Sequence, residues 1–402
     1  MPADRDIDLV ASAVAAIRDV VGPREGMVAL HEPCFRGREW DYVKQCLDTG
    51  WVSSVGSFVN DFERHLQDLT GATFAVATGT GSGALHVCLE LAGVGRGDEV
   101  LVPALSFVAT ANAVAYTGAV PHFVDCEFSS LGLDPVALDS HLRDVAVPQG
   151  DGFVNRHTGR RLAAVMPVHM FGHPCQIEAI AEVAARYRMV LVEDAAESLG
   201  SSIRGRHTGT FGRLAALSFN GNKTVTTGGG GAILTSDAPL AARAKHLTTQ
   251  AKVPHRWEYR HDAVGYNYRL PNLNAAVGCA QLEQLPAFLA SKRRLAARYA
   301  AAFASVDGVR FVAEPTDTQS NYWLCALLLD EGLEHLLEPL LAATNDAGLM
   351  TRPAWSLLAD LPMYLDAPRA TLPVSTAVTR RLINMPSSPV LCLNDVDVEV
   401  GA

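Results

Sequence analysis

The stretch Ser218–Gly231, SFNGNKTVTTGGGG, decides the fold of this 402-residue chain, because it sets Lys223 between a short apolar strand and a glycine-rich turn. Upstream, the stretch MVLVEDAAES begins with a second apolar run, which is followed by Glu193 and Asp194. Runs of this length are typical of buried strands, and parallel sheets bind ligands outside the carboxyl ends of their strands. Lys223 and Asp194 both fall just past such ends, which makes them candidates for one site.

A lysine and an aspartate in these places are the two groups that pyridoxal phosphate (PLP) requires. The lysine amine forms a Schiff base, and the aspartate keeps the pyridine nitrogen protonated so that the ring withdraws electrons. Taken alone, Lys223 would be a solvated loop lysine and Asp194 a helix N-cap, the commoner roles of these residue types. Few charges surround Lys223 and glycines follow it, which favours a compact site.

From about residue 72, short apolar runs alternate with helical stretches. This βα rhythm predicts an α/β fold with a mostly parallel, seven-stranded sheet covered by helices on both faces. The seven runs read FAVAT, EVLVP, VPHFVD, LAAVMPV, MVLVED, LAALSF and GGAILTS. Helices are expected at residues 5–21, 38–49, about 60 onward, 83–91, 106–116, 177–187 and 240–247.

The predicted organisation has four parts. An N-terminal helical segment and substrate loop occupies residues 1–60, and a large PLP-binding domain follows over 61–274. A bridging helix spans 275–304, and Pro286 should kink or interrupt it, because proline removes a helical hydrogen bond. A smaller α+β domain completes the chain over 305–402.

The composition is that of a soluble globular protein, 49% hydrophobic and 19% charged. The net charge of -10 argues against a nucleic-acid partner, and no apolar run reaches the length of a membrane span. The acidic N-terminus is not a secretory or transit signal, and the eight cysteines form no CxxC pair. We expect a cytoplasmic protein with buried, reduced cysteines and without a metal site.

The phosphate of the cofactor needs its own binding group. The stretch ATGTGSGALH opens a helix directly after FAVAT, and helix N-termini bind phosphate through backbone amides, here best those of Ser82 and Gly83. Ser218 could add a hydroxyl. The glycines have the spacing GxGxG rather than GxGxxG, which disfavours a dinucleotide site.

Two further residues fit a PLP site. Phe107, after the run EVLVP, is placed to stack on the pyridine ring, although a core phenylalanine would look the same. Glu197, three residues after Asp194, could contact the cofactor or substrate, or merely complete a helix cap. The segment VGYNYRLPNLNAA is either a turn before the long helix or a loop that reaches a neighbouring subunit's cofactor.

From about His31 to Ser388, the chain resembles the DegT/StrS-type aminotransferases of nucleotide-linked keto-sugars. These have the aspartate-aminotransferase-like type I fold of PLP-dependent transferases. SFNGNK resembles their Schiff-base motif, VEDAAES the pyridine-nitrogen motif, TGSGAL the phosphate loop, and SFVATANA the stacking motif. The resemblance implies catalytic roles for Lys223 and Asp194, and PLP contacts by Ser82, Gly83, Phe107, Asp194, Glu197, Ser218, Asn220 and Lys223. It also implies that Asn267 binds the partner subunit's cofactor phosphate, in a homodimer with shared active sites.

Other motifs resemble one branch, the LegC-type aminotransferases of legionaminic acid and related surface-glycan pathways; they include LHEPCFRGREW, DTGWVSSVGSFV, AKVPHRWEY, SNYWL and NMPSS. The branch implies a UDP-linked 2-acetamido-2,6-dideoxy-4-keto hexose as acceptor and L-glutamate as donor. Candidates for the nucleotide-sugar pocket are Trp51, Ser53, Ser54, His255, Arg256, Trp323, Trp355 and Ser387, each of which is more often structural when taken singly.

Three alternatives bear on this interpretation. The acceptor could be another keto-sugar, linked to dTDP or GDP. The protein could be a regulator with a PLP-type fold and no turnover, which would need a lost lysine or an added DNA-binding segment. Related dehydratases lack the lysine, so the presence of Lys223 argues against that activity.

Overall fold

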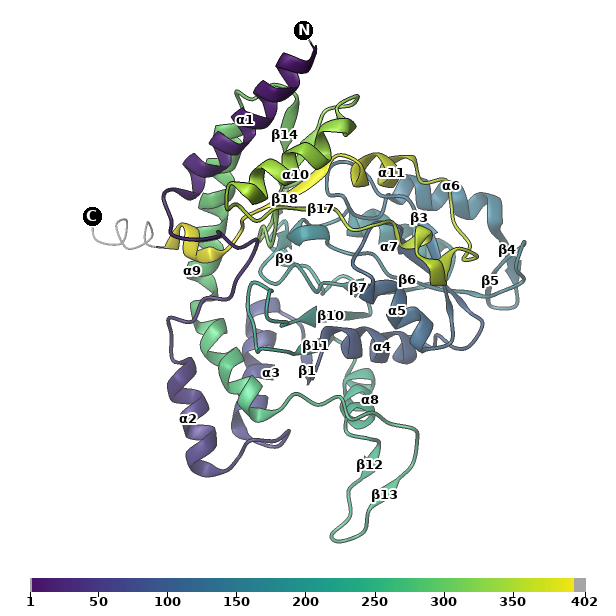
Figure 1. Cartoon of the computed structure of the whole chain (residues 1–402). Coiled ribbons are helices and arrows are strands. Elements are labelled where there is room, and N and C mark those ends of the chain that lie inside the picture. The colour runs from purple at the N-terminus through teal and green to yellow at the C-terminus, as the bar shows by residue number, and fades with distance from the viewer. Residues whose placement is uncertain (1, 394–402) are drawn as a thin grey trace.

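A seven-stranded sheet forms the centre of the molecule in the computed structural model, which describes residues 2–393 (Figure 1). Its strand order is β1-β11-β10-β7-β6-β2-β3, and only β11 runs antiparallel to its neighbours. The strands are β1 (Phe74–Thr78), β2 (Glu99–Pro103), β3 (Val120–Val124), β6 (Leu162–Val165), β7 (Val190–Asp194), β10 (Leu214–Ser218) and β11 (Gly231–Thr235). The predicted α/β fold with a mostly parallel, seven-stranded sheet is confirmed.

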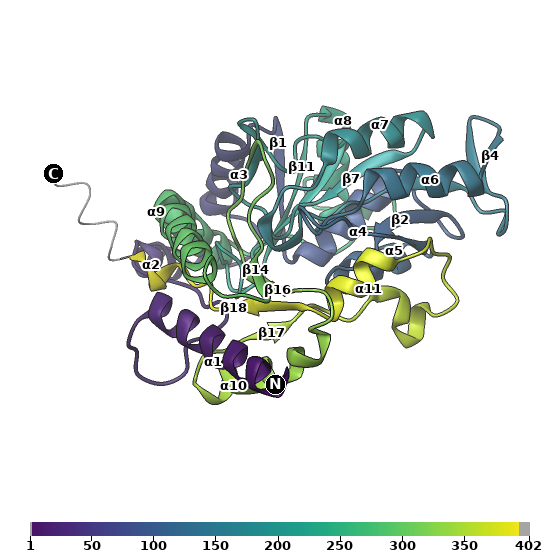
Figure 2. The same cartoon turned by 90° about the horizontal axis from the view of Figure 1, so that it is seen from above.

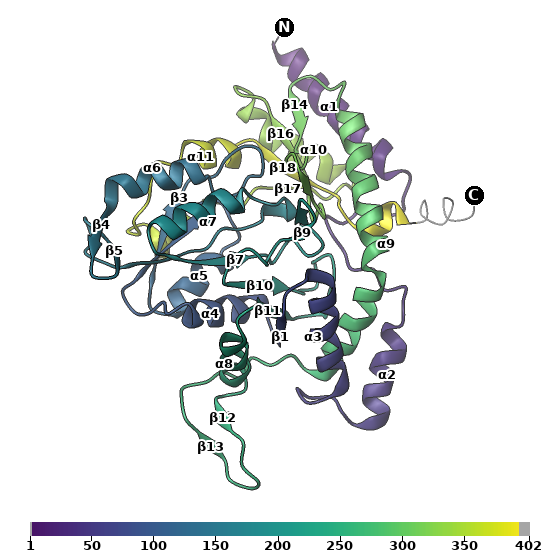
Figure 3. The same ribbon diagram turned by 180° about the vertical axis from the view of Figure 1, so that it is seen from behind.

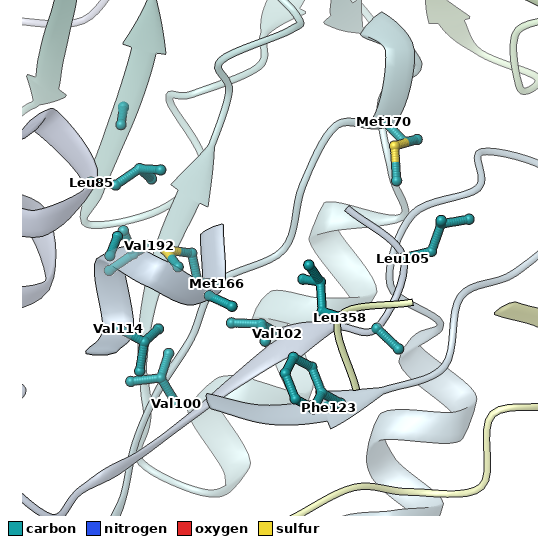
Figure 4. Close-up of a cluster of buried hydrophobic side chains, with 14 of the residues drawn as sticks. Leu85, Val100, Val102, Leu105, Val114, Phe123, Met166, Met170, Val192 and Leu358 are labelled. Carbon is teal, nitrogen blue, oxygen red and sulfur yellow. The ribbon is translucent and has the colours of Figure 1, made fainter. Parts of the chain in front are cut away.

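Helices cover both faces of this sheet, because successive strand residues point to opposite sides. Ala216 and Ile233 face α4, α5 and α8, whereas Ala215 and Leu234 face α3 and α9, and Leu101 faces α6 and α7. Figure 4 shows the first of these clusters, in which Phe123 is fully buried. The helices are α3 (Ser57–Thr70), α4 (Gly81–Leu91), α5 (Ala109–Tyr116), α6 (Pro135–Val145), α7 (Ile177–Arg186), α8 (Ala238–Thr248) and α9 (Asn272–Phe303).

The long helix α9 joins the large sheet to the C-terminal part of the chain. It continues through Pro286, so this residue does not interrupt the helix; of the two predicted effects, a kink agrees with the ribbon, which changes direction along its length (Figure 3). Pro286 is exposed, and its ring therefore meets solvent rather than a packed neighbour. The first half of α9 packs with α3 and the last half with the small sheet.

A second, antiparallel sheet with the order β14-β16-β18-β17 forms the smaller α+β part. The N-terminal helix α1 shares its core with this sheet, with α10 and with the end of α9, as Figure 2 shows from above. Helix α1 therefore packs with the C-terminal part. The elements are α1 (Pro2–Val21), α2 (Glu39–Thr49), β14 (Val309–Phe311), β16 (Cys325–Leu329), α10 (Leu337–Asp346), β17 (Arg352–Pro353), α11 (Pro373–Thr379) and β18 (Leu382–Met385).

Several small elements were not predicted. They are the pairs β4 (Ala146–Gln149) with β5 (Gly152–Asn155) and β12 (Lys252–Val253) with β13 (Arg260–His261), the sheet of β8 (Ser202–Ile203), β9 (Arg206–His207) and β15 (Thr318–Gln319), and short 3-10 turns at Met170–Gly172, Glu334–Leu336, Leu358–Asp360, Pro362–Tyr364 and Pro389–Leu391. Residues 251–264, which we call the β12–β13 arm, project away from the body (Figures 1 and 3).

No described helix is both long and apolar enough to cross a membrane. All eight cysteines are buried, as predicted, and none of them forms a disulfide within residues 2–393.

Candidate active site

A cavity of about 1030 Å³ lies at the carboxyl ends of β7 and β10. Its wall contains the N-terminus of α4, the segment around Phe107, and residues of β17 and β18 from the small sheet. Lys223 and Asp194 both line it, so the structure brings the two predicted reactive groups into one space. The volume is in the range of small-molecule sites.

Lys223 follows β10 in a tight turn in which its N–H donates to the carbonyl of Asn220 at 3.0 Å. Its Nζ lies 3.5 Å from Oε1 of Glu197 and 3.6 Å from the centre of the Trp323 ring. Burial lowers the pKa of the Lys223 amine, although Glu197 and Asp194 oppose the shift. An amine with a lowered pKa is a better nucleophile and base near neutral pH.

Asp194 ends β7 with a carboxylate that is only 4% exposed. One oxygen accepts a hydrogen bond from Thr110 Oγ1 at 2.8 Å and the other from the N–H of Ala196 at 3.2 Å. Burial raises the pKa of Asp194 in spite of these bonds. Within residues 2–393 this carboxylate makes no ion pair, so a protonated ring nitrogen would supply the cation that a buried carboxylate needs.

The neighbouring acid, Glu193, points to the opposite side of the strand and has a structural role. Its carboxylate accepts hydrogen bonds from the N–H groups of Gly209, Phe211 and Gly212, and it pairs with Nε2 of His169 at 3.0 Å. The backbone N–H of His169 also donates to the Asp194 carbonyl at 3.2 Å. This buried network fixes the end of β7 from which Asp194 enters the cavity.

The phosphate end of the cavity lies at the N-terminus of α4. Thr80 caps the helix, and its Oγ1 accepts the N–H of Gly83 at 2.9 Å. The Gly83 amide thus has a partner in the structure, and Gly83 does not line the cavity, so its contact with the phosphate stays a prediction. Gly81, Ser82 and Ser218 do line it, and the amides at this helix end suit an anion.

Two glycines allow this helix end to approach the lysine loop. A Cβ on Gly231 would lie 2.5 Å from the carbonyl oxygen of Thr80, and a Cβ on Gly81 would lie 2.8 Å from Cβ of Ser218. Both positions therefore require glycine, since no side chain fits. The residues present thus fit the phosphate, the pyridine nitrogen and the carbonyl carbon of PLP.

Some other predicted residues also line the cavity. Phe107 is 52% exposed, and its ring centre lies 5.8 Å from that of Trp355. It precedes α5, which begins at Ala109 rather than at Ser106 as predicted. The predicted site residues in the wall are Ser82, Phe107, Asp194, Glu197, Ser218, Asn220, Lys223, Trp323 and Trp355.

The remaining predicted residues lie outside this cavity. Ser387 is fully buried. Its hydroxyl donates to the Met385 carbonyl at 2.7 Å and accepts the N–H of Cys325 at 2.8 Å, contacts that hold the small sheet, and its place in the sugar pocket stays a prediction. The others lie on the surface, either before α3 or on and beside the β12–β13 arm: Trp51, Ser53, Ser54, His255, Arg256 and Asn267.

Sequence reasoning missed many residues of the wall, among them the polar residues His31, Thr110, Arg352 and Asn384. Both ring nitrogens of His31 and Oδ1 of Asn384 are buried without a hydrogen-bond partner. Thr110 lies four residues after Ser106, and their hydroxyls are 2.9 Å apart, a helical spacing that could have indicated it. The other three come from distant segments, and nothing local in the sequence indicates them.

A type I fold with a buried aspartate, a loop lysine and a helix N-terminus around one cavity defines the class of PLP-dependent enzymes. The sequence profile of the DegT/DnrJ/EryC1/StrS aminotransferase family matches residues 33–401, and the chain belongs to this family. It is therefore a PLP-dependent aminotransferase-type enzyme, and its cofactor is PLP.

Named relatives cover almost the whole chain. GDP-perosamine synthase of Escherichia coli O157:H7 is 35% identical over 364 residues, 90% of this chain and 94% of that protein. GDP-perosamine synthase of Caulobacter vibrioides is 35% identical over 378 residues, 93% of this chain and 97% of that protein. The aminotransferase TlmJ from Streptoalloteichus hindustanus has a similar structure, with a TM-score of 0.82 and 28% identity, covering 94% of this chain and 97% of the other.

Proposed function

We propose that this enzyme converts the ketone of a nucleotide-linked 4-keto-6-deoxy sugar into an amine, with L-glutamate as the amino donor. The observation that carries the proposal is the buried, unpaired Asp194 carboxylate in the same cavity as the Lys223 amine. The bound PLP supplies an electron sink for both half-reactions. The cavity is large enough for a substrate beside the cofactor.

Each residue has a distinct task in this proposal. With PLP bound, Lys223 would take a proton from the substrate carbon as a base and then give up that proton as an acid. Asp194 would hold the proton of the ring nitrogen, and Phe107 would offer its face to the ring. The amides of Gly81 and Ser82 and the hydroxyl of Ser218 would hold the phosphate. The apolar wall around Trp323 and Trp355 excludes water from the transferred proton.

Two relatives indicate which nucleotide the acceptor sugar carries. The similar proteins of Escherichia coli O157:H7 and Caulobacter vibrioides are GDP-perosamine synthases rather than LegC-type enzymes, and they support the GDP-linked alternative better than the UDP-linked sugar. We therefore propose a GDP-linked keto-sugar as the acceptor. The LegC-like branch, its UDP-linked substrate and a place in legionaminic acid synthesis stay predictions.

A spectroscopic titration tests the donor and the acceptor separately. The purified protein should show a band near roughly 410–430 nm that moves toward about 330 nm when L-glutamate is added. Keto-sugars linked to GDP, UDP or dTDP are then offered one at a time, and we expect the GDP-linked sugar to restore the band fastest. Faster recovery with the UDP-linked sugar would support the LegC-like assignment instead. The absence of a band after PLP is added would contradict an enzymatic role.

We also propose that two chains share each active site. Trp51, Trp257 and Tyr259 are 58%, 70% and 84% exposed, a degree that is unusual for large aromatic residues on a monomer. The predicted phosphate ligand Asn267 is exposed beside the β12–β13 arm, outside the cavity of its own chain. A second copy would cover the aromatic residues and receive Asn267 at its own cofactor.

Subunit mixing tests this arrangement. Lys223→Ala and Asn267→Asp should each be inactive alone, the second because a carboxylate repels the phosphate. In a dimer with shared sites, an equal mixture should recover about a quarter of wild-type activity, because half of the dimers are mixed and each has one intact site. Activity that stays at the level of the separate variants after verified subunit exchange would show that each chain uses its own Asn267.

A further inference from the structure

The amine of Lys223 lies between a carboxylate and an aromatic face. Its Nζ is 3.6 Å from the ring centre of Trp323 and 3.5 Å from Oε1 of Glu197. The ring of Trp323 is only 4% exposed, so the contact is desolvated. An aromatic face attracts an ammonium group, whereas it offers no such attraction to a neutral amine.

This contact is built into the backbone rather than made by a free side chain. The indole Nε1–H of Trp323 donates to the carbonyl of Asn222, the residue before Lys223, at 2.7 Å. The N–H of Trp323 donates to Oδ1 of Asn321 at 2.7 Å, and Nδ2 of the same Asn321 donates to the Glu197 carbonyl at 2.9 Å. One network therefore fixes both groups that flank the amine, together with the turn that carries it.

Two further contacts hold the plane of the indole. The ring centre of Trp355 lies 6.4 Å away with an interplanar angle of 22°, and Nζ of the buried Lys292 donates to the Trp323 carbonyl at 3.3 Å. The sequence had suggested Trp323 as a contact of the nucleotide sugar. The structure instead directs its face at the catalytic amine.

We propose that Trp323 is a positioning residue for the catalytic amine: its indole face, together with Glu197, holds the ammonium group of Lys223 whenever that amine is not bonded to the cofactor. This inference rests on the proposed role of Lys223. The amine takes a proton from the substrate carbon and must keep it until it passes to the cofactor carbon. Trp323 stabilises the protonated form during that interval and keeps the amine in place.

The test measures the proton affinity of Lys223 in the cofactor-free protein, where no turnover is needed. The rate at which a small amine-directed reagent labels Lys223, read by peptide mass spectrometry, is followed against pH. Trp323→Leu should lower the pH midpoint of labelling, and at neutral pH the rate should rise about tenfold, because the ammonium loses a desolvated cation–π contact. Trp40→Leu is the control, since it removes an indole that is 78% exposed on α2, and its midpoint should equal that of the wild type.

Other titrating groups near the amine remain in place in these variants. They are Asp194 at the end of β7, Glu197 three residues later, and the buried His31, whose charge interacts with those of Lys223 and Lys292. Wider access to the amine would raise the labelling rate at every pH without moving the midpoint. A shift of the midpoint therefore reports proton affinity, and a change of the high-pH plateau alone would overturn the proposal.

A second variant keeps the shape of the side chain, so that misfolding cannot account for its result. Fluorinated tryptophan placed at position 323 weakens the negative face of the ring but keeps its size and hydrogen bond. The midpoint should fall as fluorine atoms are added. An unmoved midpoint, or a raised KM for the keto-sugar with an unmoved midpoint, would return Trp323 to the sugar pocket. Failure of the proposed function would show separately, as turnover retained by Lys223→Ala.

Discussion

Replacing Lys223 with alanine should abolish transamination and the visible absorption band of the cofactor. The variant loses both the amine that bonds the cofactor and the group that moves the proton, so we expect the glutamate half-reaction to slow by about 10⁴-fold or more. The lysine packs between Glu197 and Trp323, and its removal leaves unchanged the residues proposed to hold the phosphate. Stopped-flow absorbance with L-glutamate measures the rate, and fluorescence measures PLP retained after gel filtration.

Two variants make this result specific. Lys44→Ala removes an exposed lysine of α2 that pairs only with Asp48, and it should retain full activity. Lys223→Arg keeps a positive charge but cannot form the bond to the cofactor, and it should be as inactive as the alanine variant. Turnover by either Lys223 variant at the wild-type rate would rule out this residue as the catalytic lysine.

Asp194→Asn should act in opposite directions on catalysis and on the stability of the cofactor-free protein. An amide cannot keep the ring nitrogen protonated, so the half-reaction should slow by about 10³-fold. The cofactor-free variant should be more stable by about 1 kcal/mol, because the wild type buries a carboxylate without a cation. PLP should therefore raise the melting temperature of the wild type more than that of the variant.

The stability difference should depend on pH in a defined direction. Because burial raises the pKa of Asp194 in the folded protein, the unfolded chain loses its proton first as pH rises, and the wild type becomes less stable over that window. The difference between the variant and the wild type should be complete above the folded pKa and should vanish below the unfolded pKa of about 4. Urea unfolding at several pH values measures it.

A matched substitution controls for the loss of charge. Asp48→Asn changes an aspartate whose side chain is 59% exposed, and it should leave both the stability of the cofactor-free protein and the activity unchanged. If Asp194→Asn destabilises the cofactor-free protein at neutral pH, the carboxylate has a cation partner there, and its assignment to the ring nitrogen loses its physical basis.

Much of the large sheet could be predicted from local patterns. Each of its seven strands lies within a short apolar run, and such a run is buried in almost any arrangement of the sheet. The helices predicted by spacing were found within a few residues, with the largest differences at N-termini such as that of α5. The small pairs β12–β13 and β4–β5 were missed, because two-residue to four-residue strands carry no periodicity of their own.

The sequence by itself was enough to predict Lys223 and Asp194 as site residues, the helix proposed to bind the phosphate, and the order of the elements. Each of these features depends on a few consecutive residues. Only the tertiary structure decided which groups are free to act. The Gly83 amide donates to Thr80, the Ser387 hydroxyl is buried in its own hydrogen bonds, and the indole of Trp323 lies against the Lys223 amine. These outcomes depend on distances between segments that are far apart in the chain, and those distances are set by packing rather than by local propensity.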